Sequence, residues 1–262
     1  MNRLHTYHFP FLSGELKIEA VNSIPQDIAK GISDLIIVLK NDLNDKYLNS
    51  SSYKLNNSSI ELPVIVSPEF IEFFEMNVEY FIATRSDFSP FKNPVIDKSN
   101  LGDYFIIDKS TDTITKIKDF KFDSPLQKFY LIQKIVDELN RNNIKNYYLK
   151  YVDVAASFGN VRWNASFEIL EDEHTLDFKL HNSYAYFFAP ISSERQASSK
   201  FANIDKEINA EYIILIGANL TDLKILSLEI ANLSWLHQYK QFKSENNIHI
   251  IIYTANKDII NL

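Results

Sequence analysis

The 262-residue chain contains no cysteine and only five glycines. The absence of cysteine excludes disulfides, thiolate zinc sites and a cysteine nucleophile. The glycines lie too far apart for a Gly-x-Gly-x-x-Gly or Walker loop, in which the backbone approaches phosphates where a Cβ would intrude. We therefore expect neither a Rossmann dinucleotide site nor a P-loop nucleotide site.

Excess positive charge and long apolar runs are also lacking. The formal net charge is −7 and the pI is near 5.4, so the surface as a whole does not attract polyanions such as nucleic acids or anionic membranes. The first twenty residues lack the apolar core of a signal peptide, and no run approaches the roughly 18 apolar residues of a membrane span. The sequence predicts a cytoplasmic protein with no nucleic-acid partner and no membrane span.

Helical and strand periodicities alternate along the chain without a repeat. Helices are expected over 23–43 (with Ser23 as N-cap), 67–85, 124–143 and 221–239. Strands are expected over 4–9, 15–20, 146–157, 161–170, 175–180, 184–190, 211–217 and 249–255, with a β-hairpin over 103–118. The segment 48–62 is rich in Asn and Ser, which favour turns, and is predicted to be a loop. This mixed order predicts the α+β class, as a single domain over residues 1–262.

Three local patterns are compared with a metal site, a serine nucleophile and a site for a planar ligand. His5 and His8 point to opposite faces of a strand, and the spacing of His174 and His181 is weak support for a metal, so no metal site is expected. No Gly-x-Ser-x-Gly elbow presents a serine nucleophile. Arg162 beside Trp163 could hold a planar ligand by cation–π attraction, but an arginine covering a sheet face is favoured.

Three segments together carry a family resemblance. "VIVSPEFIEFFEMNVEYFIATRSDFSPF" follows a "v-s-p-e" helix start and a turn ending in F-D-p-T, with Ser89 at the Asp. After the hairpin, "FDSPLQKFYLIQ" is similar to D-x-G-G-I-A-K-G-Y-A-V-D and keeps Lys128 and Tyr130. "YVDVAASFG" is similar to G-G-D-i-x-a-x-G and keeps Asp153 and Gly159. In this order the segments resemble the ApbE family of FAD:protein FMN transferases, which attach FMN to a Thr or Ser of a target protein using FAD and magnesium.

The resemblance implies an ApbE-like α+β fold and names candidate residues. If flavin binding is retained, Lys128, Tyr130, Asp153 and Asp205 are the residues it assigns to the flavin nucleotide. FAD and magnesium are implied as cofactors only if the family activity is retained.

The chain departs from the family pattern at positions that the resemblance ties to chemistry. Ala202 stands at the family's histidine in "ANIDKEIN", Pro125 and Val152 are among the replacements of motif glycines, and Lys224 and Leu228 stand at the magnesium-binding Asp and Thr. A register shifted by two residues would bring Asp222 there instead. A lysine ammonium repels a metal ion and leucine offers it no oxygen. No catalytic residue and no metal ligand is therefore assigned.

The leading hypothesis is an ApbE-like pseudoenzyme that binds or scaffolds an unidentified protein partner. The first alternative is a divergent but active FMN transferase or FAD hydrolase that uses Asp153, Lys128 and either Asp222 or Asp205. The second is an unrelated α+β interaction module that displays the aromatic residues of 184–188, although a buried strand is the favoured interpretation of that run.

Overall fold

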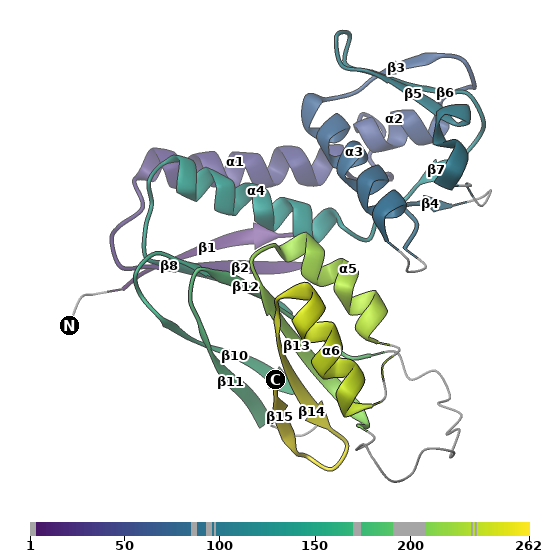
Figure 1. Cartoon of the computed structure of the whole chain (residues 1–262). Helices are drawn as coiled ribbons and strands as arrows, with labels where there is room; N and C mark the ends of the chain where they lie inside the picture. The colour runs from purple at the N-terminus through teal and green to yellow at the C-terminus, as the bar shows by residue number, and fades with distance from the viewer. Residues whose placement is uncertain are drawn as a thin grey trace, which may run out of the picture. The chain divides into compact units, whose positions relative to one another are not determined.

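The computed structural model describes residues 4–84, 88–92, 96, 98–169, 174–190, 208–231, 233 and 235–262. The chain forms two compact units, and the colour bar of Figure 1 locates the residues of each by number. Unit 1 contains Met1–Ile24 and Asn140–Leu262, and unit 2 contains Pro25–Leu139. Both units combine helices with antiparallel sheets, which confirms the α+β class. That residues 1–262 act as one domain stays a prediction.

Unit 1 is built on an eight-stranded sheet of order β1-β2-β8-β9-β12-β13-β14-β15, in which each neighbouring pair is antiparallel. A separate hairpin pairs β10 with β11. The strands are β1 His5–Phe11, β2 Gly14–Ala20, β8 Tyr147–Tyr151, β9 Val154–Phe158, β10 Trp163–Ile169, β11 His174–Leu180, β12 Ser183–Phe188, β13 Ala210–Gly217, β14 His249–Thr254 and β15 Ile259–Asn261.

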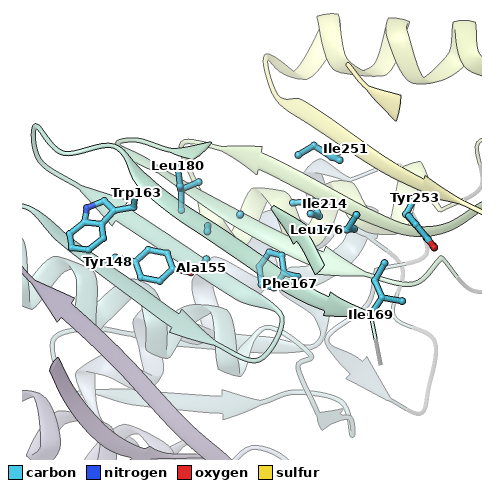
Figure 2. Packing of buried hydrophobic residues seen from close by; sticks show 12 residues of the cluster. Tyr148, Ala155, Trp163, Phe167, Ile169, Leu176, Leu180, Ile214, Ile251 and Tyr253 are labelled. Atoms are coloured by element: carbon cyan, nitrogen blue, oxygen red, sulfur yellow. The ribbon is translucent and has the colours of Figure 1, made fainter. Parts of the chain in front are cut away.

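The β10-β11 hairpin packs against one face of this sheet and forms an aromatic core with it (Figure 2). Trp163 is buried and stacks on Tyr148 with centroids 5.7 Å apart, while Phe167 stacks on Phe187 at 5.2 Å. The burial of Trp163 supports the interpretation of this segment as a sheet face. Burial and the charge of Glu19 together raise the pKa of Tyr148 to about 12.

Two helices pack on strands of the sheet: α5 (Leu220–Ile230) on β12 and β13, and α6 (Leu236–Asn246) on β14. The prediction of one helix over 221–239 was wrong. The first helix ends at a C-cap on Ala231, and a new one begins where the Trp235 backbone N–H donates to Gln238 Oε1 at 3.0 Å. The end of β13 lies close to α5, because a Cβ on Gly217 would lie 3.0 Å from Leu223 Cδ2.

Unit 2 holds four helices, a short 3₁₀ segment and two small sheets, of order β3-β6-β5 and β4-β7. The elements are α1 Gln26–Asp42, α2 Ser51–Asn57, α3 Pro68–Ala83, α4 Gln127–Arg141, η1 Lys98–Asp103, β3 Pro63–Ile65, β4 Phe91–Lys92, β5 Phe105–Asp108, β6 Thr113–Lys116 and β7 Lys121–Phe122. The core is a cluster of phenyl rings around Phe74, whose centroid lies 4.8 Å from that of Phe122 and 5.0 Å from that of Phe105.

Helix α2 corrects the prediction of a loop over 48–62. Ser50 caps the helix by accepting a hydrogen bond from the Tyr53 backbone N–H, and Leu55 is fully buried. The buried Asn56 side chain donates to the Phe122 carbonyl at 2.9 Å and accepts from the Phe122 N–H at 2.7 Å. Distant tertiary hydrogen bonds therefore outweigh the local turn preference of Asn and Ser.

Two other boundary predictions were also wrong. Helix α1 has Pro25 rather than Ser23 at its N-cap, without a side-chain cap. The run 146–157, predicted as one strand, forms the β8-β9 hairpin with Val152 and Asp153 at its turn. By contrast, Ser67 caps α3 as expected, accepting a hydrogen bond from the Phe70 N–H at 3.0 Å.

Candidate functional site

The candidate residues fall in two units. Lys128 and Tyr130 lie on α4 in unit 2, and Asp153 lies in the β8-β9 turn of unit 1. Asp205 and Ala202 lie outside the described residues.

Tyr130 holds α4 against α3. Its hydroxyl donates to the Glu69 carbonyl at 3.0 Å and its ring lies 5.1 Å from that of Phe73. Burial raises the pKa of Tyr130 far above its usual range, and the carboxylate of Glu72 raises it further. The phenol is therefore neutral over the physiological pH range, and its contacts are those of a packing residue.

The segment that resembles the flavin motif borders a cavity of about 60 Å³ in unit 2. Asp123, Ser124 and Gln127 line it, together with Leu43, Asn44, Asp45, Ser52, Phe73 and Phe122. Lys92 pairs with Asp123, and this hydrogen bond and charge, with a smaller effect of Asp45, raise the pKa of Lys92. The cavity exceeds the roughly 10–15 Å³ that one water needs, so it can admit a small polar group.

In the same segment, side chains replace the glycines of the family motif. Phe129 is buried, and the Lys128 ammonium lies 4.8 Å from the centroid of its ring. A phenyl ring fills space that a glycine leaves open, so the backbone at Phe129 does not allow the close approach that a glycine permits.

Unit 1 contains a second polar cluster, on the sheet strand β12 and helix α5. Lys224 of α5 donates from Nζ to the Tyr186 hydroxyl at 3.4 Å and lies 5.5 Å from the centroid of its ring. Tyr186 is 6% exposed and stacks on Phe188 with centroids 5.4 Å apart. We call Asp153, Tyr186, Lys224 and Ser227 the Lys224 cluster.

The strand pairing brings Asp153 to this cluster. Tyr186 pairs with Val154, the residue after Asp153, and the Phe187 N–H donates to the Asp153 carbonyl at 2.8 Å. Burial raises the pKa of Tyr186 above its usual range and the negative charge of Asp153 raises it further, while the neighbouring Ser227 hydroxyl acts in the opposite direction. A neutral phenol thus contacts the Lys224 ammonium and is influenced by the charge of Asp153.

The Lys224 cluster does not fit a magnesium ion. Magnesium takes a near-octahedral shell of oxygens, and the cluster contains one carboxylate and an ammonium that repels a cation. Leu228, one turn along α5, supplies no oxygen, and the Ser227 hydroxyl donates to the Lys224 carbonyl at 2.6 Å. Within the described residues no group of three or more His, Asp or Glu side chains could hold a metal. The His8 imidazole, considered above as a metal ligand, is paired with a carboxylate instead, since its Nδ1 lies 2.7 Å from Glu15 Oε1.

The turn that carries Asp153 has a strained backbone. Val152, a β-branched residue, adopts a left-handed conformation with φ of 42°. Because its side chain is 70% exposed, burial does not offset the cost of this conformation. Replacing Val152 by Gly should raise the free energy of unfolding of unit 1 by about 1 kcal/mol, since glycine adopts positive φ without this cost.

Chemical denaturation followed by circular dichroism would measure the change in Val152→Gly. Val161→Gly is a matched control, because Val161 is also exposed but its φ is not positive. That control should be neutral or destabilised, and an unchanged or lowered stability in Val152→Gly would show that the turn is not strained.

Known proteins resemble this chain in structure rather than in sequence. No protein-family model matches it, and no curated protein sequence matches it significantly. Solved structures do match, over 99% of this chain in each case. The flavinyl transferase ApbE of Pseudomonas stutzeri has a TM-score of 0.70 at 10% identity, with 95% of its chain covered. The apbe protein of Thermotoga maritima has 0.69 at 12%, and the flavin transferase ApbE of Vibrio cholerae 0.65 at 12%, each with 97% covered.

The chain has the ApbE fold. The likeness spans both units, and it confirms the fold that three degenerate segments indicated. At 10–12% identity it establishes the ApbE fold alone. None of the helices in the described part of the chain has the length and apolar character that crossing a membrane requires.

Two features of the site were missed by sequence reasoning. Sequence reasoning gives Tyr186 no role in the site, although it favours a buried strand for 184–188, and the burial of Tyr184 and Tyr186 confirms that interpretation. The pairing of Lys224 with Tyr186 joins residues 38 positions apart. The alternation of Tyr184, Tyr186 and Phe188 was the one signal that could have placed these side chains on a common face of the strand.

Proposed function

We propose that the chain is an ApbE-like pseudoenzyme, acting as one domain over residues 1–262, that does not transfer FMN and instead binds or scaffolds a protein partner in the cytoplasm. The single observation that carries the proposal is the position of the Lys224 ammonium, 3.4 Å from the Tyr186 hydroxyl.

The chemistry of the family explains why this lysine matters. Transfer of FMN from FAD breaks the pyrophosphate bond, releases AMP and joins the FMN phosphate to a hydroxyl of the target. Negative charge on the leaving phosphate must be stabilised, and a metal ion commonly does so. In the resemblance Lys224 and Leu228 stand at the metal-binding positions. Neither side chain can bind magnesium, so we expect the reaction to be lost.

Binding of a flavin nucleotide without its transfer is a second candidate function. The cavity bordered by Asp123, Ser124 and Gln127 supports it, because this segment is similar to the flavin motif and offers hydrogen-bonding groups. In this proposal Lys128, Asp153 and Asp205 contribute to nucleotide binding, while the packed side chain of Tyr130 supports α4.

Chromatography of the reaction products tests the loss of activity. The purified protein is incubated with FAD and magnesium, with and without a flavinylation target, and AMP is quantified. AMP is the readout because both FMN transfer and FAD hydrolysis would release it. We expect no AMP above the buffer control. The Pseudomonas stutzeri enzyme serves as positive control. Release of AMP in proportion to the concentration of this protein would support the divergent enzyme instead.

Thermal unfolding with and without FAD tests binding in the same samples. A ligand that binds only the folded state raises the melting temperature, and its stabilisation grows with the ratio of its free concentration to its Kd. A rise with FAD but no AMP supports binding without transfer, and the absence of any rise contradicts the second candidate.

A further inference from the structure

We infer that the Lys224 ammonium is a tethered cation that takes the place of a bound divalent ion in unit 1, so that this protein uses no magnesium at the Lys224 cluster. The inference rests on the proposed function and deepens it, since it states how the cluster differs chemically from a metal-dependent one.

The position of Lys224 is fixed by packing rather than by a flexible surface contact. Its carbonyl accepts from the Ser227 hydroxyl at 2.6 Å within α5, and its ammonium lies over the Tyr186 ring. The ring is buried between β12 and α5 and stacks on Phe188. A cation over an aromatic face is attracted to the ring's negative quadrupole, and partial burial strengthens this attraction.

The charge of the cluster is balanced by the lysine itself. The backbone of Asp153 lies next to Tyr186 in the fold, because its carbonyl accepts from the Phe187 N–H at 2.8 Å, and its negative charge acts on the same phenol that the Lys224 ammonium contacts. Such an arrangement needs no external cation for neutrality. A divalent ion entering it would meet one favourable charge and one unfavourable charge, and the two effects oppose each other.

The charges of the cluster predict how replacements of Lys224 change the affinity for Mn²⁺. Replacing Lys224 by Asp reverses the charge and provides a second carboxylate near Asp153. Because a divalent ion within a few ångströms responds strongly to such a reversal, we expect the affinity for Mn²⁺ to increase about ten-fold or more. Lys224→Ala only removes the ammonium and should shift the affinity in the same direction by a smaller factor.

Titration of the full chain with Mn²⁺, followed by the electron paramagnetic resonance of the free ion, measures these affinities without FAD. Lys240→Asp is the matched control, since it makes the same charge change on an exposed position of α6. The double variant Lys224→Asp with Asp153→Asn tests whether Asp153 is part of the new site. Circular dichroism melting confirms that each variant is folded, and Lys224→Ala carries the test if Lys224→Asp does not fold.

We expect weak Mn²⁺ binding by the wild type, unchanged when Asp153→Asn is introduced alone. Lys224→Asp should bind Mn²⁺ more tightly, and adding Asp153→Asn to it should remove that gain. Lys240→Asp should show no gain. Two results would overturn the inference: Mn²⁺ binding by the wild type that depends on Asp153, or folded Lys224 variants with wild-type affinity. Release of AMP from FAD tests the proposed function separately, so either idea can fail while the other stands.

Discussion

Phe74→Ala should lower the free energy of unfolding of unit 2 by about 3–5 kcal/mol, the usual cost of removing a buried phenyl ring. Phe74 is fully buried and its ring lies at the centre of the aromatic core. The centroid distances from Phe74 are 6.4 Å to Phe70, 5.9 Å to Phe91, 5.0 Å to Phe105, 6.4 Å to Phe120 and 4.8 Å to Phe122. The loss combines apolar transfer, edge-to-face ring contacts and a residual cavity.

Urea denaturation of the full chain, followed by far-ultraviolet circular dichroism, would measure the loss in Phe74→Ala. Ile82→Ala is the matched control on the same helix, because Ile82 is 55% exposed and its replacement should change stability by less than about 0.5 kcal/mol. If Phe74→Ala and Ile82→Ala proved equally stable, the ring cluster would not be the core of unit 2.

Gly159→Ala should destabilise unit 1 by about 3 kcal/mol, because strain and a backbone clash act together. Gly159 has φ of 104°, and a Cβ there would lie 2.4 Å from the Asn146 backbone N and 2.8 Å from its Cα. The same corner is held by hydrogen bonds from the Gly159 N–H to Asn182 Oδ1 and from the Asn160 N–H to Asn146 Oδ1. A side chain would have to move the backbone and break these bonds.

The control for Gly159→Ala has the opposite expected sign. Gly31 lies inside α1, where a Cβ would meet no atom within 4 Å, so Gly31→Ala should stabilise the chain by about 0.5–1 kcal/mol. Thermal melting of both variants measures the contrast. A Gly159→Ala protein as stable as the wild type would contradict the geometry of this corner.

Periodicity predicted most elements that bury a clear apolar face. The β1-β2 hairpin, α3 with its Ser67 cap, and the β5-β6 hairpin all lie where local pattern and packing agree. The failures arose where tertiary contacts override local preference. Asn56 is satisfied by Phe122, 66 residues away, so α2 forms in a segment of turn-favouring residues. The β8-β9 turn has Val152 where positive φ is usually signalled by Gly or Asn.

The candidate site could be predicted only in part. Segment order led to Lys128, Asp153 and Lys224 as positions of interest, but their surroundings depend on the fold. Tyr186 comes to Asp153 through strand pairing and to Lys224 through the packing of α5. The cavity beside Asp123 likewise joins the end of α1 to the segment before α4. Such contacts between distant segments have no local signal in one sequence.

The most direct test of lost transfer is the covalent attachment of flavin to a target protein. This chain and the Pseudomonas stutzeri ApbE are incubated in parallel with FAD, magnesium and a target domain bearing an acceptor threonine, and flavin fluorescence is read in a denaturing gel. We predict a fluorescent target band with the Pseudomonas stutzeri enzyme and none with this protein, even at equal molar amounts of protein and target. A fluorescent target band formed by this protein would contradict the account.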